Sequence, residues 1–179
     1  KGQLAQFRHA GITLREGAYA QVKDLVIAHH PRDQVVPDEL WGEAGITVIG
    51  DSTLNITGGE IHGNVLGIIA MTGGLCMATE VKAHNNREAG IWLEDANPKS
   101  TLSHCTSSGN LSYGVGLKSS IAGPGPHIED CTLSENAFGL YVEGNGFAPV
   151  VLRNQIRGNA STGIMLRGCA GEFKANTVK

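Results

Sequence analysis

The chain has 179 residues, a formal net charge of −3, 41% hydrophobic residues and only 5% aromatic residues. The chain lacks the excess of basic residues that is typical of proteins that bind nucleic acid or anionic membranes. No apolar run approaches the roughly 18 residues of a membrane-spanning helix. The 25 glycines, about twice the usual share, favour β structure with tight turns in a single domain over residues 1–179.

The first segment, KGQLAQFRHAG, has no signal-peptide core, no initiator methionine and no capping element. We therefore expect residues 1–179 to be part of a longer chain, with any targeting signal outside it. After Ile27 the stretch AHHPRDQVVPDELWGEA is about eleven residues longer than the repeat described below requires. Residues 28–44 are predicted to form an inserted loop, which either carries recognition or covers the side of the fold.

A short phrase then returns along the chain, in which an asparagine precedes a glycine that opens an apolar triplet. The marker glycines are Gly11, Gly45, Gly67, Gly90, Gly114, Gly139 and Gly163, with spacings of 34, 22, 23, 24, 25 and 24 residues. Repetition at this period is typical of a solenoid. The apolar pattern inside each unit has period two, which favours strands over paired helices.

Stacking the units on their glycines gives columns that are apolar and therefore predicted to point inward. One residue after the glycine the column reads Ile46, Ile68, Ile91, Val115, Leu140 and Ile164, and three residues after it Val48, Ala70, Leu93, Leu117, Val142 and Leu166. A second strand contributes Ile61, Ala83, Ser107, Leu133, Ile156 and Val178. Each unit of about 23 residues is thus predicted to be one rung of a parallel β-helix, with rungs about 4.8 Å apart.

The repeated polar residues have a structural explanation in such a coil. The glycine permits a positive φ or a close approach at a corner. Asparagine tolerates similar corners, and its amide can bond to its counterpart one rung away, which predicts an asparagine ladder.

The phrases CTLSENAFGLYVEGNG and NQIRGNASTGIMLRG resemble the right-handed parallel β-helix repeats of the carbohydrate-binding and sugar-hydrolase group. That group includes pectin-lyase-like enzymes, periplasmic factors for maturing copper enzymes, and substrate-recognition regions of F-box proteins. The resemblance covers residues 11–179. It implies an all-β, right-handed, single-stranded parallel β-helix of six to seven rungs of 22–25 residues. We expect no cofactor.

Motifs for catalysis are missing, because the Asn-x-Asp, Asp-Asp, Gly-His-Gly and Arg-x-Lys stretches of galacturonan hydrolases do not occur. The acidic candidates are Glu94-Asp95, Glu129-Asp130 and Glu143. Four residues after the marker glycine the column reads Glu94, Lys118, Glu143 and Arg167, which predicts a ladder of ion pairs that lowers the carboxyl pKa values. We therefore assign no catalytic residue, and an enzyme acting on acidic polysaccharide remains the alternative.

Histidine and cysteine patterns do not indicate a metal site. His62 and His84 are predicted to stack outward on neighbouring rungs, but a zinc site needs three or four ligands, so surface histidines are favoured. Cys105 and Cys131 share an inward column, which predicts stacked thiols without a disulfide. Localisation stays open, although unpaired cysteines favour an intracellular compartment.

The column two residues after each marker glycine is expected to face outward, yet it reads Thr47, Ile69, Trp92, Gly116, Tyr141 and Met165. Trp92 and Tyr141 are two rungs apart, roughly 10 Å, and Gly116 is expected to leave a shallow gap between them. Such an apolar strip can stack sugar rings or anchor a protein side chain. The competing interpretation is that a loop, such as the one holding Trp41, covers it.

The sequence therefore predicts a non-catalytic recognition scaffold for a protein or polysaccharide partner. The predicted ligand-binding residues are Trp92, Tyr141, Ile69, Met165, Glu94, Lys118, Glu143 and Arg167. A third alternative is a structural segment that associates end to end through its open rungs, since a coil cut across its rungs leaves unpaired backbone groups.

Overall fold

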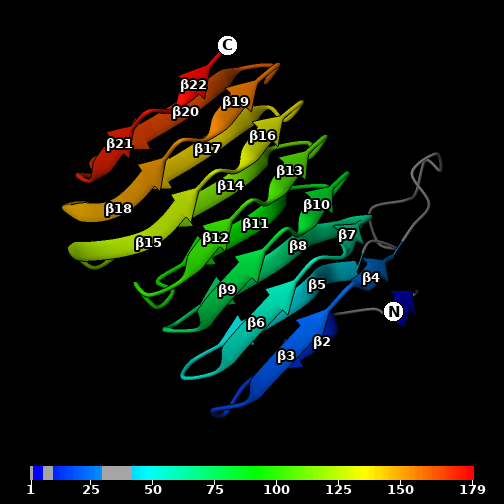
Figure 1. Cartoon of the computed structure of the whole chain (residues 1–179). Helices are drawn as coiled ribbons and strands as arrows, with labels where there is room; N and C mark the ends of the chain where they lie inside the picture. Colours follow the sequence, from blue (N-terminus) through cyan, green and yellow to red (C-terminus); the bar gives the residue numbers. More distant parts are fainter. Residues whose placement is uncertain (1, 6–9, 30–41) are drawn as a thin grey trace.

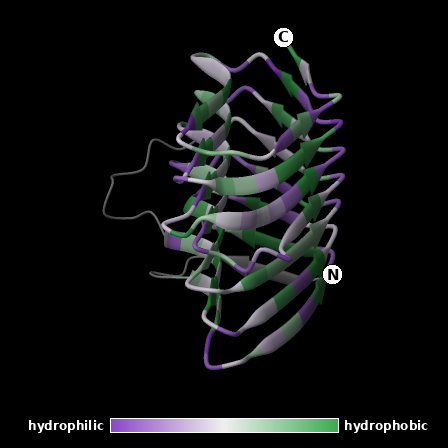
Figure 2. Ribbon diagram, turned by 90° about the vertical axis from the view of Figure 1, so that its left-hand side faces the viewer, coloured by the Kyte–Doolittle hydropathy of each residue, from purple (hydrophilic) through white to green (hydrophobic). Residues whose placement is uncertain are grey.

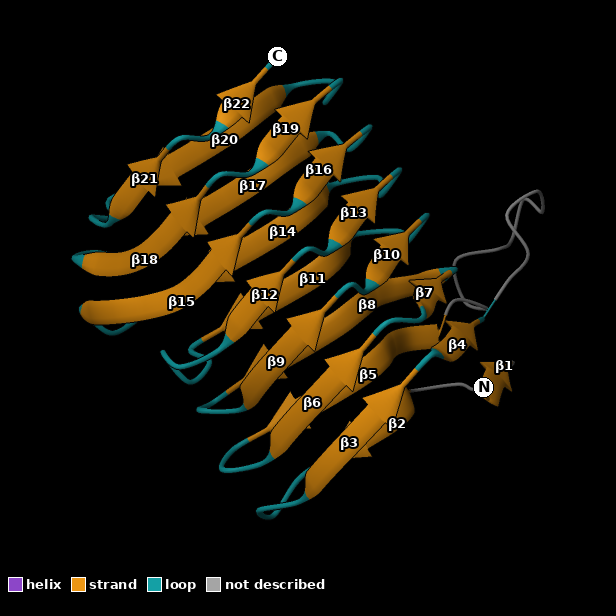
Figure 3. Ribbon diagram, in the orientation of Figure 1, coloured by secondary structure: helices purple, strands orange, loops and turns teal. Residues whose placement is uncertain are grey.

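A computed structural model describes residues 2–5, 10–29 and 42–179, and these residues form strands in three parallel sheets (Figures 1 and 3). Sheet A holds β1 (Gly2–Ala5), β4 (Leu25–Ala28), β7 (Glu60–His62), β10 (Lys82–His84), β13 (Thr106–Ser108), β16 (Thr132–Ser134), β19 (Gln155–Arg157) and β22 (Thr177–Val178). Sheet B holds β2 (Ala10–Leu14), β5 (Gly42–Ile49), β8 (Asn64–Met71), β11 (Ala89–Glu94), β14 (Tyr113–Lys118), β17 (Phe138–Glu143) and β20 (Thr162–Arg167). Sheet C holds β3 (Tyr19–Lys23), β6 (Thr53–Thr57), β9 (Leu75–Thr79), β12 (Thr101–Ser103), β15 (Gly123–Glu129), β18 (Phe147–Leu152) and β21 (Glu172–Lys174).

The chain visits the sheets in the fixed order B, C, A, so each rung contributes one strand to every sheet. Equivalent positions are in register between rungs, as in the pairing of Ile91 with Ile68 on one side and with Val115 on the other. This is a parallel β-helix, and the predicted fold is confirmed. Figure 2 shows the coils stacked side-on, with hydrophilic residues recurring at the turns.

The predicted inward columns line the interior of the coil. Ile46, Ile68, Ile91, Leu117 and Leu140 are at most 1% exposed, and they belong to one continuous hydrophobic cluster. In β20, the last strand of sheet B, Leu166 is 49% exposed because no further strand covers it. The period-two pattern of apolar residues thus fills the coil, and burial of these side chains stabilises it.

A ladder of asparagines runs through the corner between sheets A and B and confirms the predicted asparagine ladder. Each side-chain Nδ2 donates to the Oδ1 of the next asparagine: Asn64 to Asn86 at 3.3 Å, Asn86 to Asn110 at 3.0 Å, Asn110 to Asn136 at 2.9 Å and Asn136 to Asn159 at 3.1 Å. The same Oδ1 atoms accept backbone N–H groups from the rung before. A second ladder joins Asn154 to Asn176.

The corner geometry differs in one respect from the sequence prediction. The positive φ falls on the residue before the ladder asparagine, for example 63° at Gly109 and 59° at Glu135. The marker glycines instead permit close approach, since a Cβ at Gly114 would lie 2.6 Å from the carbonyl oxygen of Gly139. Of the two roles predicted for the marker glycine, close approach is therefore the one that applies.

Most of the predicted insertion at 28–44, including Trp41, lies outside the described residues, since β4 ends at Ala28 and β5 begins at Gly42. Over the described ranges the chain forms no helix that could cross a membrane.

Candidate functional site

The outer face of sheet B carries the apolar strip that the sequence predicted. Ile69, Trp92, Gly116, Tyr141 and Met165 are paired across β8, β11, β14, β17 and β20 in one continuous row. Ile69 and Tyr141 are only 8% and 7% exposed, whereas Trp92 and Met165 are half-buried. The row is thus partly shielded from solvent, although it lies on the outer side of the coil.

The expected gap at Gly116 is not present, because the Trp92 side chain leans across it. A Cβ on Gly116 would collide with the indole ring. The ring thereby reaches Tyr141, and the two rings stack with centroids 6.1 Å apart and planes 15° apart. The prediction of two separate aromatic anchors roughly 10 Å apart was therefore wrong.

Tyr113 and Phe138 complete this aromatic cluster, and sequence reasoning missed both. Tyr113 contacts Trp92 at a centroid distance of 5.3 Å, Tyr141 at 5.1 Å and Phe138 at 5.4 Å. Both residues precede a marker glycine, so strict alternation from the inward column would place them inside. The marker glycine occupies the tight inner corner, where it interrupts the alternation. The recurrence of aromatic residues just before Gly114 and Gly139 was the available signal.

The polar groups of the Trp92 and Tyr141 rings donate hydrogen bonds to carboxylates two residues later in the same strands. Trp92 Nε1–H donates to Glu94 Oε2 at 3.1 Å, and the Tyr141 hydroxyl donates to Glu143 Oε2 at 2.6 Å. The hydrogen bond to Glu143 raises the pKa of Tyr141, so the phenol stays protonated. Arg167 lies over the Tyr141 ring at 5.9 Å.

The predicted ladder of ion pairs forms only in part. Lys118 Nζ lies 2.9 Å from Glu94 Oε1, and the hydrogen bonds from Lys118 and Trp92 lower the pKa of Glu94 as predicted. Glu143 pairs with neither Lys118 nor Arg167 within 4.0 Å, because its carboxylate accepts the Tyr141 hydroxyl instead. The alternation of charge in this column therefore does not continue as a chain of contacts.

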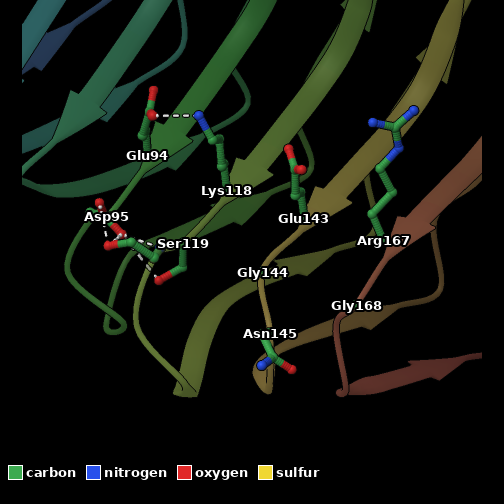
Figure 4. Close-up of a pocket in the computed structure, with 10 residues that line it drawn as sticks. Glu94, Asp95, Lys118, Ser119, Glu143, Gly144, Asn145, Arg167 and Gly168 are labelled. Carbon is green, nitrogen blue, oxygen red and sulfur yellow. Dashed lines mark hydrogen bonds and ion pairs between the residues drawn. The ribbon is translucent and has the colours of Figure 1, made fainter.

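These charged residues line a polar pocket at the corner between sheets B and C (Figure 4). The pocket has a volume of about 570 Å³ and is lined by Glu94, Asp95, Lys118, Ser119, Ser120, Glu143, Gly144, Asn145, Arg167 and Gly168. Asp95 accepts hydrogen bonds from the Ser120 N–H at 2.7 Å and from the Ser119 and Ser120 hydroxyls. The backbone N–H of Ser120, followed by the hydroxyls, lowers the pKa of Asp95.

A second, more apolar hollow adjoins it on the other side of Glu94. It has a volume of about 250 Å³ and is lined by Leu66, Ile69, Glu88, Ala89, Trp92, Glu94 and Tyr113. Its residues come from β8, from β11 and the residue before it, and from the start of β14, so it lies mainly on the β8 side of β11. Glu94 therefore belongs to both depressions.

The remaining acidic candidates form a separate surface cluster. Arg153 bridges Glu129 at 2.6 Å and Asp130 at 2.8 Å. Asp130 lies in the turn after β15 with φ of 53°, so the two carboxylates do not point to opposite sides as they would in a strand. The Arg153 guanidinium lowers the pKa of Asp130, so this carboxylate stays ionised. The cluster is therefore an ion-pair network.

Two pairs of residues, His62 with His84 and Cys105 with Cys131, lie on neighbouring rungs as the columns predicted. The His62 and His84 rings lie 4.9 Å apart with planes 11° apart, but His84 is only 5% exposed, so the interpretation as surface histidines is wrong for it. Cys105 and Cys131 are buried and unpaired. The Cys105 thiol and burial raise the pKa of Cys131, and burial raises the pKa of Cys76 to about 12. Among the described residues no three His, Cys, Asp or Glu side chains are placed to hold a metal ion.

Comparison with known families agrees with this geometry. The family described as "Right handed beta helix region" matches residues 10–178. The chain belongs to this right-handed β-helix family. Searches of curated proteins and of solved structures found no match. Membership supports a pectin-lyase-like scaffold, and because one fold of this kind hosts many activities, the role of the outer face has to be argued from its side chains.

Proposed function

We propose that the protein is a non-catalytic recognition scaffold that binds a glycan or protein partner along the outer face of sheet B. The observation that carries this proposal is the cluster of Trp92, Tyr113, Phe138 and Tyr141 between two depressions on an outer face. Outer faces of a sheet are ordinarily polar, and contiguous apolar surface on them is typical of interaction sites.

The cluster is held in a fixed arrangement, which suits recognition. Ring stacking fixes the faces, and the hydrogen bonds to Glu94 and Glu143 fix the edges. Side chains that are already ordered lose little conformational freedom when a partner binds, and aromatic rings supply large contact areas.

The polar pocket supports the same function. Its carboxylates, hydroxyls, amide and two cations offer hydrogen-bond donors and acceptors beside the aromatic rings. A partner that lies across the rungs can therefore bury apolar surface on Trp92 and hydrogen-bond in the pocket at the same time. Binding sites commonly combine an apolar floor with a few placed polar groups in this way.

The state of the carboxylates favours recognition over the enzymatic alternative. A glycoside hydrolase needs a general acid whose pKa is raised so that it holds a proton. Hydrogen bonds instead lower the pKa of Glu94 and of Asp95, which keeps both ionised. A lyase or epimerase on acidic polysaccharide, and end-to-end association, stay predictions that no feature of this face favours.

The test compares Trp92→Ser with Tyr19→Ser, which removes a 64% exposed ring from sheet C. Both variants and the unsubstituted protein are applied to arrayed polysaccharides and arrayed peptides, and their denaturant midpoints are measured in parallel. We expect Trp92→Ser to weaken binding by about tenfold or more while Tyr19→Ser binds normally.

Unchanged binding by Trp92→Ser together with a large loss of stability would show that the cluster is covered core. Recognition would then have to be sought in residues 28–44. Equal losses of binding in both variants would also contradict the proposal, because the effect would not be specific to sheet B.

A further inference from the structure

The apolar hollow beside Trp92 has a more specific chemistry than the rest of the face. Its apolar lining consists of the aliphatic residues Leu66, Ile69 and Ala89 and the aromatic residues Trp92 and Tyr113. Both of its charged lining residues, Glu88 and Glu94, are acidic. Glu88 directly precedes β11 and Glu94 ends it, so the hollow has a carboxylate at each end of one strand.

The two carboxylates differ in how far they are already neutralised. Glu94 is paired with Lys118 and accepts the Trp92 indole N–H. Glu88 is exposed and forms no ion pair with another described residue. A ligand that enters the hollow therefore meets a negative charge that no other described residue pairs with, in a depression that two aromatic rings also line. That combination attracts a cation.

We infer that this hollow takes a single basic side chain, arginine or lysine, from a partner protein. The inference rests on the proposed recognition function and names the partner chemistry for this part of the face. The aliphatic stem lies on Leu66 and Ile69, and the cation lies against the rings and pairs with Glu88. Arginine and lysine combine an apolar stem with a charged end in the way the hollow requires.

The charge of the hollow favours a basic side chain over a sugar as its ligand. The volume of about 250 Å³ lies at the lower end of small-molecule sites, roughly 300–1,000 Å³, and is large enough for one side chain. An acidic sugar would meet only like charges in the hollow. A neutral sugar could stack on Trp92 and donate a hydroxyl to Glu88, whereas a cation adds the attraction of opposite charges to the same two contacts.

The test uses NMR of the whole chain with two blocked peptides, GGSRSGG and the same peptide with citrulline, the neutral counterpart of arginine. The readout is the indole N–H signal of Trp92, assigned with Trp41→Phe because the chain has two tryptophans. We expect the arginine peptide to shift this signal with a Kd on the order of 1 mM, and citrulline to bind at least about tenfold more weakly.

The matched variants are Glu88→Gln and Glu60→Gln, which remove one negative charge each, the second from sheet A. Glu88→Gln should weaken the arginine peptide about tenfold and leave citrulline unchanged, while Glu60→Gln changes neither. A citrulline peptide or a neutral oligosaccharide that shifts Trp92 as strongly as the arginine peptide would overturn the basic-side-chain inference and leave the recognition function standing. The absence of a Trp92 shift with every probe would overturn both.

Discussion

Trp92 and Tyr141 stack on each other although a whole rung separates their strands. The contact exists because Gly116, the residue between them in the row, has no side chain, so that the indole lies across it. One glycine thus converts two outward aromatic residues on separate rungs into a single cluster.

Gly116→Ala should therefore break the cluster. The new Cβ would collide with the indole and force it away from Tyr141, at a cost of about 1–3 kcal/mol in unfolding free energy. Near-ultraviolet circular dichroism reports the ring displacement and denaturant titration the free energy. In a Trp92→Leu background the same substitution should cost less, and additive effects would contradict the mechanism.

The asparagine ladder is expected to contribute strongly to the free energy of unfolding, although its side chains are polar. Asn110→Ala leaves the buried backbone N–H and side-chain amide of Asn86 without their acceptor, and it removes the donor to Asn136. We expect a loss of about 3 kcal/mol or more, since each orphaned buried group costs about 1–3 kcal/mol. Asn145→Ala, at an exposed position, should stay within about 0.5 kcal/mol. Similar midpoints for the two variants would count against the ladder as a stabilising element.

Inward apolar residues should contribute more to the free energy of unfolding than charged residues on the outer face. Leu140 is fully buried, and Leu140→Ala should cost about 2–5 kcal/mol through lost burial and a cavity. Glu143→Ala, on the outer face of the same strand, removes the hydrogen bond from the Tyr141 hydroxyl and should cost about 1 kcal/mol. Denaturant midpoints decide the ranking, and the reverse order would mean that inner and outer faces are interchanged.

The Glu94–Lys118 pair should be visible in an acid titration. Because the folded pKa of Glu94 is lowered, its stabilising contribution is present above the unfolded pKa of about 4.3 and disappears as the pH falls through the folded value. Lys118→Met removes the largest cause of the shift and should raise the pKa of Glu94, measured by carboxyl ¹³C NMR. Lys99→Met, at an exposed position in the turn between β11 and β12, serves as the control. Identical titration of Glu94 in all three proteins would refute the pairing.

Sequence reasoning could predict most of the coil because in-register stacking repeats each structural requirement in every rung. The columns of Ile91 and Leu93 are apolar for that reason, and the asparagine ladder follows from the same repetition. The third strand of each rung, in sheet C, was less evident because its turns from sheet B differ in length and composition from rung to rung.

The candidate site was predictable only in part. The outward row was correct, because it depends on register alone. The directions of the side chains could not be predicted. The Trp92 ring leans over Gly116 because that residue has no side chain, and Tyr113 faces outward because Gly114 interrupts the alternation of the strand. Likewise, Glu143 bonds to Tyr141 within its own strand rather than to a cation one rung away.

The order of strands in sheet A, from β1 at one end to β22 at the other, also determines how the molecule responds to force (Figure 1). Backbone hydrogen bonds between rungs run along the stacking axis, so tension applied to the two ends pulls in line with them. Load then falls on the outermost rung alone, and rungs detach one after another instead of shearing together. Each detached rung of 22 to 25 residues releases roughly 80 Å of chain. We therefore expect a tethered copy to lengthen in successive steps, one rung at a time.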